Sequence, residues 1–326
     1  RSGKYISYAS PILDASLPDG SRINATYTKD ITSRGPTFTI RKFTTTPWTP
    51  PQLLSFRTLS PEMLAYLWIL VQYKMNILIT GGTSSGKTTL LNAIAFFIPP
   101  EARVVSIEDT RELNLPRENW LPSVVRNATG AGNVGEIDLF TLLKSSFRQN
   151  PDYVIVGEVR GKEAYVLFQG MASGHASIST MHADSVDTVI KRLETPPIEL
   201  SPTLLNVLDC VCIMTHAIAK KQETRKLKEI VEIINVTPEG VAMTNTPFIW
   251  NPSDDSFYFK KNSKIFEKIA KRYGITLQEI DAEFKKRVKL IYNLYQNRVF
   301  NFQQFQDTIT QYYKKPQEVL AKLGIA

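Results

Sequence analysis

Eight consecutive residues, 81–88 (GGTSSGKT), match the phosphate-binding pattern G-x-x-x-x-G-K-[ST] at every fixed position. Glycines let the backbone N–H groups turn toward phosphate oxygens, and the start of a following helix adds positive dipole. In such a loop Lys87 reaches the β- and γ-phosphates, and the Thr88 hydroxyl binds Mg²⁺. The candidate nucleotide-binding residues are therefore Gly81, Gly82, Thr83, Ser84, Ser85, Gly86, Lys87, Thr88 and Thr89.

The segments on either side of this loop have the character that the motif requires. Residues 75–80 (MNILIT) have the composition of a buried strand, and residues 89–95 (TLLNAIA) that of a helix. Strand, loop and helix in this order are the structural context of a phosphate-binding loop. A glycine-rich turn without a ligand is therefore the less favoured interpretation.

Two adjacent carboxylates follow the next predicted strand, residues 103–107. They belong to Glu108 and Asp109 in the run VVSIEDTRE. In parallel α/β sheets ligands bind beyond the carboxyl ends of the strands. Glu108 is therefore placed to orient or deprotonate an attacking water, with a solvated turn as the alternative.

A third predicted strand, residues 153–156, is followed by Gly157 and Glu158. An apolar strand that ends in a carboxylate is the Walker B type of arrangement, in which Glu158 contacts the hydrated metal or the water. Gly157 stands where many such ATPases have aspartate, so this task falls to Glu158. Arg148 and Arg160 flank the strand, and either could stabilise transition-state charge or form a structural ion pair.

Two of the three histidines, His175 and His182, bracket a fourth predicted strand, residues 176–180. Two histidines without cysteine partners do not complete a tetrahedral zinc site, so no zinc is expected. Single histidines are most often satisfied core residues. Because these two lie in the same predicted sheet as the loop, sensing the γ-phosphate is the alternative for both.

The composition is that of a globular protein large enough for more than one domain: 326 residues, 43% hydrophobic and 21% charged. No apolar run is long enough to span a bilayer. The net charge of +8 fits a nucleic acid, an anionic membrane face or an acidic partner, and equally a basic surface without a specific partner. Cys210 and Cys212 lie in an apolar run and are expected to be buried free thiols. The first residue is Arg1, so we expect the chain to start inside a longer protein.

The order of patterns predicts an α/β fold in four parts. Residues 1–46 contain strand-like runs between turn signals and are expected to end a separate small domain. Residues 47–60 form a proline-rich linker with the character of a hinge, and 263–326 a helical extension. In residues 61–262 helices alternate with short strands, which predicts a mainly parallel sheet with helices on both faces. The strands of this sheet are predicted at 76–80, 103–107, 153–156, 176–180 and 210–214.

The C-terminal third has two predicted patterns. Residues 228–259 alternate as short strands separated by turns. Thr276 and Glu279 form a capping box, and a helix with one apolar face follows. That face either docks a partner or, as the favoured interpretation, packs on the core; its residues are Ile280, Phe284, Val288, Ile291 and Tyr295.

Taken in order, these clusters resemble the type II/IV secretion ATPase superfamily, which powers type IV pilus assembly, protein secretion and the archaellum. Residues 107–112 look like its Asp box, 148–160 like its Walker B region, and 174–184 like its His box. The resemblance extends over about residues 5–260. It implies a RecA-like P-loop ATPase core, Mg²⁺ and ATP as cofactors, and hydrolysis that drives assembly, rotation or secretion by a membrane-bound machine.

Within the superfamily, residues 192–198 (RLETPPI) and 248–252 (FIWNP) look like the archaeal branch, close to the archaellum motor ATPase and archaeal secretion ATPases. The paired C-x-x-C zinc module of many bacterial secretion ATPases is missing, which supports the archaeal interpretation. Residues 17–22 and 34–43 look like the end of the family's N-terminal domain. Arg22, Arg34 or Arg41 of that domain would then reach the phosphates when the hinge closes.

The resemblance also implies partners and a location. We expect a homo-hexameric ring, a polytopic membrane platform protein as partner, and a cytoplasmic protein held peripherally at the inner face of the membrane. No specific nucleic acid is expected, because an aromatic and basic stripe that could track a single strand is not evident in the sequence. Two alternatives are a nucleic-acid translocase and a scaffold that binds nucleotide only as a latch.

Overall fold

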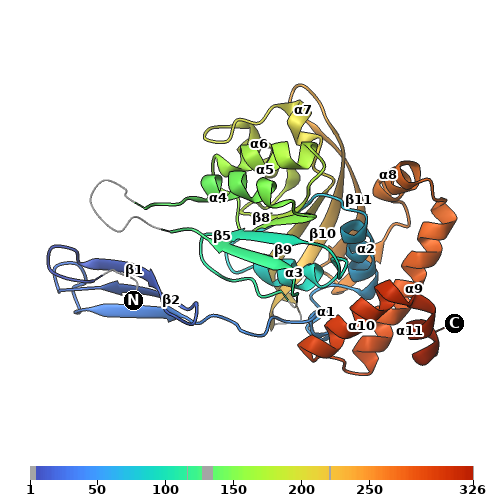
Figure 1. The fold of residues 1–326 in the computed structure, drawn as a ribbon, viewed down its shortest axis with the longest axis horizontal. Coiled ribbons are helices and arrows are strands. Elements are labelled where there is room, and N and C mark those ends of the chain that lie inside the picture. Colours follow the sequence, from blue (N-terminus) through green and yellow to red (C-terminus); the bar gives the residue numbers. More distant parts are fainter. Residues whose placement is uncertain (1–4, 116, 127–134, 220–221, 326) are drawn as a thin grey trace.

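The structure is a computed structural model that describes residues 5–115, 117–126, 135–219 and 222–325. It begins with a small antiparallel sheet, continues into a large sheet with helices on both faces, and ends in a group of helices (Figure 1). The predicted α/β fold with a mainly parallel sheet and a helical C-terminal end is confirmed. Within the described residues, no helix combines the length and apolar character needed to cross a bilayer.

The strands fall into two sheets. The first sheet has the order β1-β2-β3 and the second the order β12-β11-β10-β9-β4-β8-β7-β5-β6. The strands are β1 (Ile12–Ser16), β2 (Arg22–Thr26), β3 (Thr37–Arg41), β4 (Ile77–Gly81), β5 (Val104–Glu108), β6 (Trp120–Val124), β7 (Tyr153–Val156), β8 (Ala176–Met181), β9 (Cys210–Ala219), β10 (Gln222–Val236), β11 (Ala242–Asn251) and β12 (Ser256–Phe259).

The helices cover both faces of the nine-stranded sheet and continue beyond it (Figure 1). They are α1 (Pro50–Ser55), α2 (Pro61–Gln72), α3 (Lys87–Ala95), α4 (Leu139–Ser146), the 3-10 helix η1 (Phe147–Gln149), α5 (Glu163–Ala172), α6 (Val186–Glu194), α7 (Pro202–Leu205), α8 (Lys264–Tyr273), α9 (Leu277–Gln296), α10 (Phe302–Lys314) and α11 (Pro316–Lys322).

Two hydrophobic clusters hold the central sheet between its helices. Successive side chains of a strand point to opposite faces, so Ile77 and Ile79 of β4 join one cluster and Leu78 the other. Helices α2 and α3 cover the first face, and α4, α5 and α6 cover the second. The sheet is therefore buried on both faces, and functional side chains are expected at the ends of its strands.

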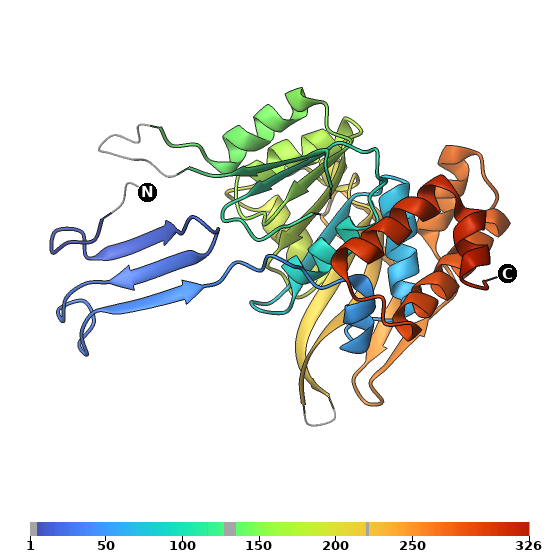
Figure 2. The same ribbon diagram turned by 60° about the horizontal axis from the view of Figure 1, so that its bottom comes forward.

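The sheet contains one strand that the sequence patterns did not indicate and three that are longer than expected, among them β9, which was predicted to end at residue 214. Strand β6 is an edge strand and contains Pro122, a residue that edge strands tolerate because they lack one ladder partner. Strands β10 and β11 are long antiparallel strands rather than the short strands expected at 228–259. The first half of β10 is polar because the β9–β10 hairpin projects from the body of the molecule (Figure 2).

The predicted linker, residues 47–60, is largely ordered on the core. Thr49 is fully buried and caps helix α1, with Pro50 in its first turn. Trp48 packs edge-to-face against Phe56, with ring centroids 5.0 Å apart. The extended part of the connection therefore precedes Pro47. The β1–β3 sheet before it lies to one side of the larger sheet in both views (Figures 1 and 2).

The C-terminal helices pack on the core. The capping box of Thr276 and Glu279 starts α9, and Ile280, Phe284 and Ile291 are buried in the same cluster as α2. The favoured interpretation of this apolar face is confirmed.

Candidate active site

The phosphate-loop sequence forms the tight turn between β4 and α3. Gly86 caps the helix in the left-handed region at φ +98°, and Gly81 has φ +147°. A Cβ at Gly81 would lie 2.6 Å from the Ser85 hydroxyl oxygen and still closer to the Met214 carbonyl oxygen. Only glycine fits at either position without strain.

Lys87 is buried at the first position of α3 and turns back over the loop. Its ammonium donates to the carbonyl oxygens of Gly81 at 3.1 Å and Gly82 at 2.8 Å. The same Nζ lies 3.4 Å from Nδ1 of His182. Burial lowers the pKa of Lys87, and the nearby carboxylate of Glu158 opposes this effect. The loop thus holds one desolvated amine at its centre.

Glu108 ends strand β5 with its side chain almost wholly buried. Its Oε1 accepts hydrogen bonds from the backbone N–H groups of Glu112 at 2.8 Å and Leu113 at 2.9 Å. Its Oε2 is buried and has no hydrogen-bond partner among the residues that the structure describes. Burial raises the pKa of Glu108 to about 7, although these two N–H donors oppose the rise. A carboxylate with this pKa is suited to take a proton near neutral pH.

The space around Glu108 explains the glycine at the end of β7. A Cβ at Gly157 would lie 3.2 Å from Cγ of Glu108, which is tighter than an ordinary contact. The Gly157 carbonyl also accepts a hydrogen bond of 2.6 Å from the Thr180 hydroxyl. An aspartate at position 157 would therefore press on Glu108, and the carboxylate of this strand tip belongs to Glu158 instead.

Glu158 sits at the centre of a group of charged side chains. Its Oε1 lies 3.4 Å from Nε2 of His182 and 3.3 Å from Nε of Arg160. Arg160 also pairs with Asp109 at 3.1 Å, so it connects the tips of β5 and β7. Burial lowers the pKa of His182, and Lys87 adds to the effect. The lowered pKa favours the neutral imidazole of His182, which has one ring nitrogen that donates a hydrogen bond and one that accepts.

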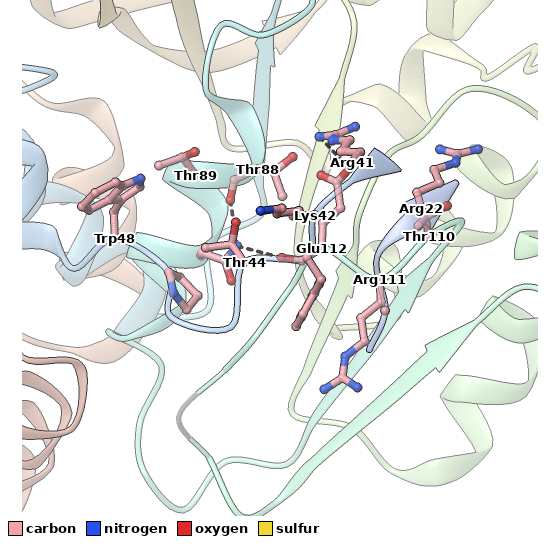
Figure 3. Close-up of a pocket in the computed structure, with 14 residues that line it drawn as sticks. Arg22, Arg41, Lys42, Thr44, Trp48, Thr88, Thr89, Thr110, Arg111 and Glu112 are labelled. Carbon is pink, nitrogen blue, oxygen red and sulfur yellow. Dashed lines mark hydrogen bonds and ion pairs between the residues drawn. The ribbon is translucent and has the colours of Figure 1, made fainter. Parts of the chain in front are cut away.

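The N-terminal sheet reaches the same place from the opposite side. Arg41, at the end of β3, forms an ion pair of 2.9 Å with Glu112 of the β5 tip. Figure 3 shows Arg41 directed at Glu112, with Arg22 of β2 beside Thr110. Side chains from the small sheet and from the core therefore line one continuous pocket.

Most predicted site residues come together around one cavity of about 570 Å³. Both predicted acids and all the strand tips that the motifs indicated contribute to it. Its lining includes Thr83, Ser84, Gly86, Lys87, Thr88, Thr89, Arg41, Glu108, Glu158, Arg160 and His182.

Of the predicted residues outside the loop, two lie elsewhere. His175 precedes β8, at the end opposite His182, and its ring packs on Phe147 with centroids 4.9 Å apart. Arg148 belongs to the neighbouring 3-10 helix η1. A strand of six residues is about 20 Å long, so histidines that bracket it cannot both reach one phosphate. Neither His175 nor Arg148 lines the cavity of this chain.

One residue of the cavity was not indicated by any sequence pattern. Arg225 lies on β10 of the projecting hairpin, and its Nε donates to the Ser84 carbonyl at 2.8 Å. The polar run QETRK around it has no motif and no apolar alternation. Only the pairing of β10 with β9 brings it over the phosphate loop.

Comparison with known proteins identifies the family. The model of the type II/IV secretion system protein family matches residues 5–242, which is most of the chain. The chain belongs to this family. The resemblance drawn from the Asp-box, Walker B and His-box patterns is confirmed.

Two relatives come from Methanocaldococcus jannaschii, in agreement with the archaeal branch predicted above. The protein MJ1287 is 42% identical over 264 residues, which are 81% of this chain and 97% of MJ1287. The protein MJ0900 is 39% identical over 326 residues, which are 98% of this chain but 59% of MJ0900. The chain therefore spans about three fifths of the length of this second relative.

Bacterial proteins are also similar. The conjugal transfer protein TrbB of Rhizobium radiobacter is 31% identical over 228 residues, 68% of each chain. Among solved structures, the VirB11 ATPase from the Brucella suis type IV secretion system gives a TM-score of 0.44 at 28% identity and covers 70% of this chain and 78% of its own. The family assignment rests on the sequence matches.

Proposed function

We propose that this chain hydrolyses ATP at the cavity over loop 81–88. The observation that carries the proposal is Glu108, a buried carboxylate with a pKa of about 7 and one unpaired oxygen, in the same cavity as Lys87. A phosphate loop alone binds nucleotide, whereas hydrolysis also needs a group that activates water. The shared cavity supports both roles for one site.

The residues divide the reaction between them as follows. Lys87 and the loop N–H groups bind the β- and γ-phosphates. Glu108 accepts a proton from the attacking water, whose oxygen forms a bond to the γ-phosphorus while the bond to the β,γ-bridging oxygen breaks. The products are ADP and inorganic phosphate. His182 and Arg160, which both contact Glu158, would stabilise the charge that develops on the γ-phosphate.

The oxygen donors at the cavity fit Mg²⁺. The Thr88 hydroxyl and the Glu158 carboxylate both line it. Within the described ranges, no three His, Cys, Asp or Glu side chains form a metal-binding group. Mg²⁺ commonly takes one or two protein oxygens together with water and substrate phosphates, so Thr88 and Glu158, the latter through water, would hold it. When bound, it would neutralise phosphate charge.

A second cavity, of about 520 Å³, adjoins the loop and offers a place for the nucleoside. Trp48, Phe56, Leu90 and Met214 form the apolar part of its lining, which also contains charged side chains such as Arg57 and Glu223. Aromatic and aliphatic side chains of this kind pack against a purine base. Its position beside Gly86 would let the triphosphate continue from the base into the loop.

We further propose that hydrolysis drives a type IV filament or type II secretion-like machine, including those of the archaellum type, from the inner face of the membrane. Arg41 contacts Glu112 across the two sheets, so phosphate charge can compete for this arginine and move the N-terminal sheet. The family membership supports a homo-hexamer and a polytopic membrane partner. Work would be delivered to that partner.

Steady-state phosphate release tests the proposal. The chain should release phosphate from ATP in the presence of Mg²⁺, and Lys87→Ala should abolish the release. Lys314→Ala, which removes an exposed lysine from α10, is the matched control and should leave it unchanged. No release by the unmodified chain, or equal release by Lys87→Ala, would contradict the assignment.

A further inference from the structure

Arg225 lies over the outer side of the phosphate loop. Its aliphatic stem packs above Gly86, where a Cβ would meet its Cδ at 3.5 Å. Its Nε–H is held by the carbonyl oxygen of Ser84 at 2.8 Å. Ser84 itself has φ +58°, so this carbonyl is presented by a residue in the left-handed region. The arginine is thereby fixed in place over the turn that would surround a phosphate.

The rest of the guanidinium is available. Arginine has five N–H donors in a planar fork, and the structure gives a partner within the described residues only to the one on Nε. Arg225 has no ion pair with a carboxylate in the described part of the chain. Its NH1 and NH2 groups therefore keep donors for a phosphate, in the geometry that arginine uses for bidentate binding.

The position of Arg225 between two cavities indicates which phosphate this is. Arg225 lines both the polar cavity with Glu108 and Glu158 and the second cavity with Trp48. Gly86 and Thr89 of the loop also line both. A nucleotide with its base against Trp48 in the second cavity and its γ-phosphate at the acids would place its α-phosphate at this shared boundary.

We propose that Arg225 is a substrate-contacting residue, and that its NH1 and NH2 groups bind the α-phosphate of ATP while its Nε–H braces the loop at Ser84. This inference rests on the proposed function, because it takes ATP as the ligand of the loop. Lys87 and Arg225 then hold the triphosphate from opposite sides of the loop. The hairpin β9–β10 becomes part of the nucleotide site rather than a distant projection.

Binding of ATP and of its α-thio analogues, measured by titration calorimetry, tests this role. Arg225→Ala should weaken ATP binding about 10- to 100-fold, the value of a hydrogen bond to a charged group. The unmodified chain should distinguish the two α-thio diastereomers, because sulfur replaces a different oxygen in each. Arg225→Ala should lose this discrimination, and a β-thio substitution should affect both proteins equally.

Two further variants act as controls. Lys228→Ala removes an exposed positive charge from the same strand and should bind ATP like the unmodified chain. Arg225→Lys keeps the positive charge, but its single ammonium would have to contact both the Ser84 carbonyl and the α-phosphate. Its ATP affinity should therefore fall between that of the unmodified chain and that of Arg225→Ala. Thermal unfolding without nucleotide should be the same for all four chains within about 2 °C, because the side chain is exposed.

Three results would overturn the inference. Unchanged ATP affinity in Arg225→Ala would show that Arg225 does not contact ATP. Weaker binding with full α-thio discrimination would show that Arg225 only stabilises the loop. Each of these would leave the proposed ATPase function intact. Failure of the unmodified chain to bind ATP would contradict both proposals together.

Discussion

Glu108→Gln should remove a loss of folding stability that occurs as the pH rises toward 7, and it should stop ATP hydrolysis. Burial raises the pKa of Glu108 from its ordinary 4.5 to about 7. The folded state therefore binds a proton more tightly than the unfolded chain, and stability falls as pH rises between these two values. At about 1.36 kcal/mol per pKa unit, the loss above pH 7 amounts to about 3 kcal/mol.

Glutamine removes this loss because it cannot ionise. Its amide oxygen can still accept the N–H groups of Glu112 and Leu113, while its NH₂ group takes the place of the unpaired Oε2. An unpaired buried NH₂ costs about 1–3 kcal/mol at every pH, so the informative quantity is the pH dependence rather than the absolute stability.

Denaturant unfolding followed by tryptophan fluorescence at pH 5 and pH 8.5 measures this quantity. Between these pH values the unmodified chain should lose about 3 kcal/mol relative to Glu108→Gln. In parallel, the variant should bind ATP normally without releasing phosphate. Equal pH dependence of the two proteins would refute the account of burial, and turnover like that of the unmodified chain would remove Glu108 as the base.

Three other substitutions test neighbouring parts of the structure. Gly157→Ala should lower kcat at least tenfold with little change in ATP affinity, because the new Cβ presses on Glu108; unchanged kcat would contradict this. Asp255→Ala should destabilise the chain by about 3–5 kcal/mol in denaturant unfolding, because it leaves the buried ammonium of Lys226 with the Arg57 carbonyl oxygen but without the carboxylate that balances its charge. Arg41→Ala should reduce phosphate release but change stability by less than about 1 kcal/mol, since its ion pair is exposed.

The parts of the site that could be predicted from sequence are those fixed by local geometry. The loop between β4 and α3 needs glycine at two backbone positions, and acids at the tips of β5 and β7 share one edge because parallel strands end together. Both features are therefore visible as short motifs. The strand alternation of residues 61–262 similarly predicted most of the sheet.

What could not be predicted depends on contacts far apart in the sequence. Arg225 reaches the loop only through the long β9–β10 hairpin, whose polar first half carries no strand signal. The histidines at 175 and 182 look equivalent in sequence, but a strand separates them across the sheet. The strand around Pro122 was missed because proline argues against a central strand, and the sequence does not show that this strand lies at the edge of the sheet.

The central claim is that one cavity holds the triphosphate between the loop and the acids of two strand tips. A crystal structure of the chain with Mg²⁺ and a non-hydrolysable ATP analogue tests it most directly. We predict the β- and γ-phosphates within hydrogen-bond distance of Lys87 and the loop N–H groups, with Glu108 and Glu158 facing the γ-phosphate. An analogue bound elsewhere, or either carboxylate turned away from the γ-phosphate, would contradict it.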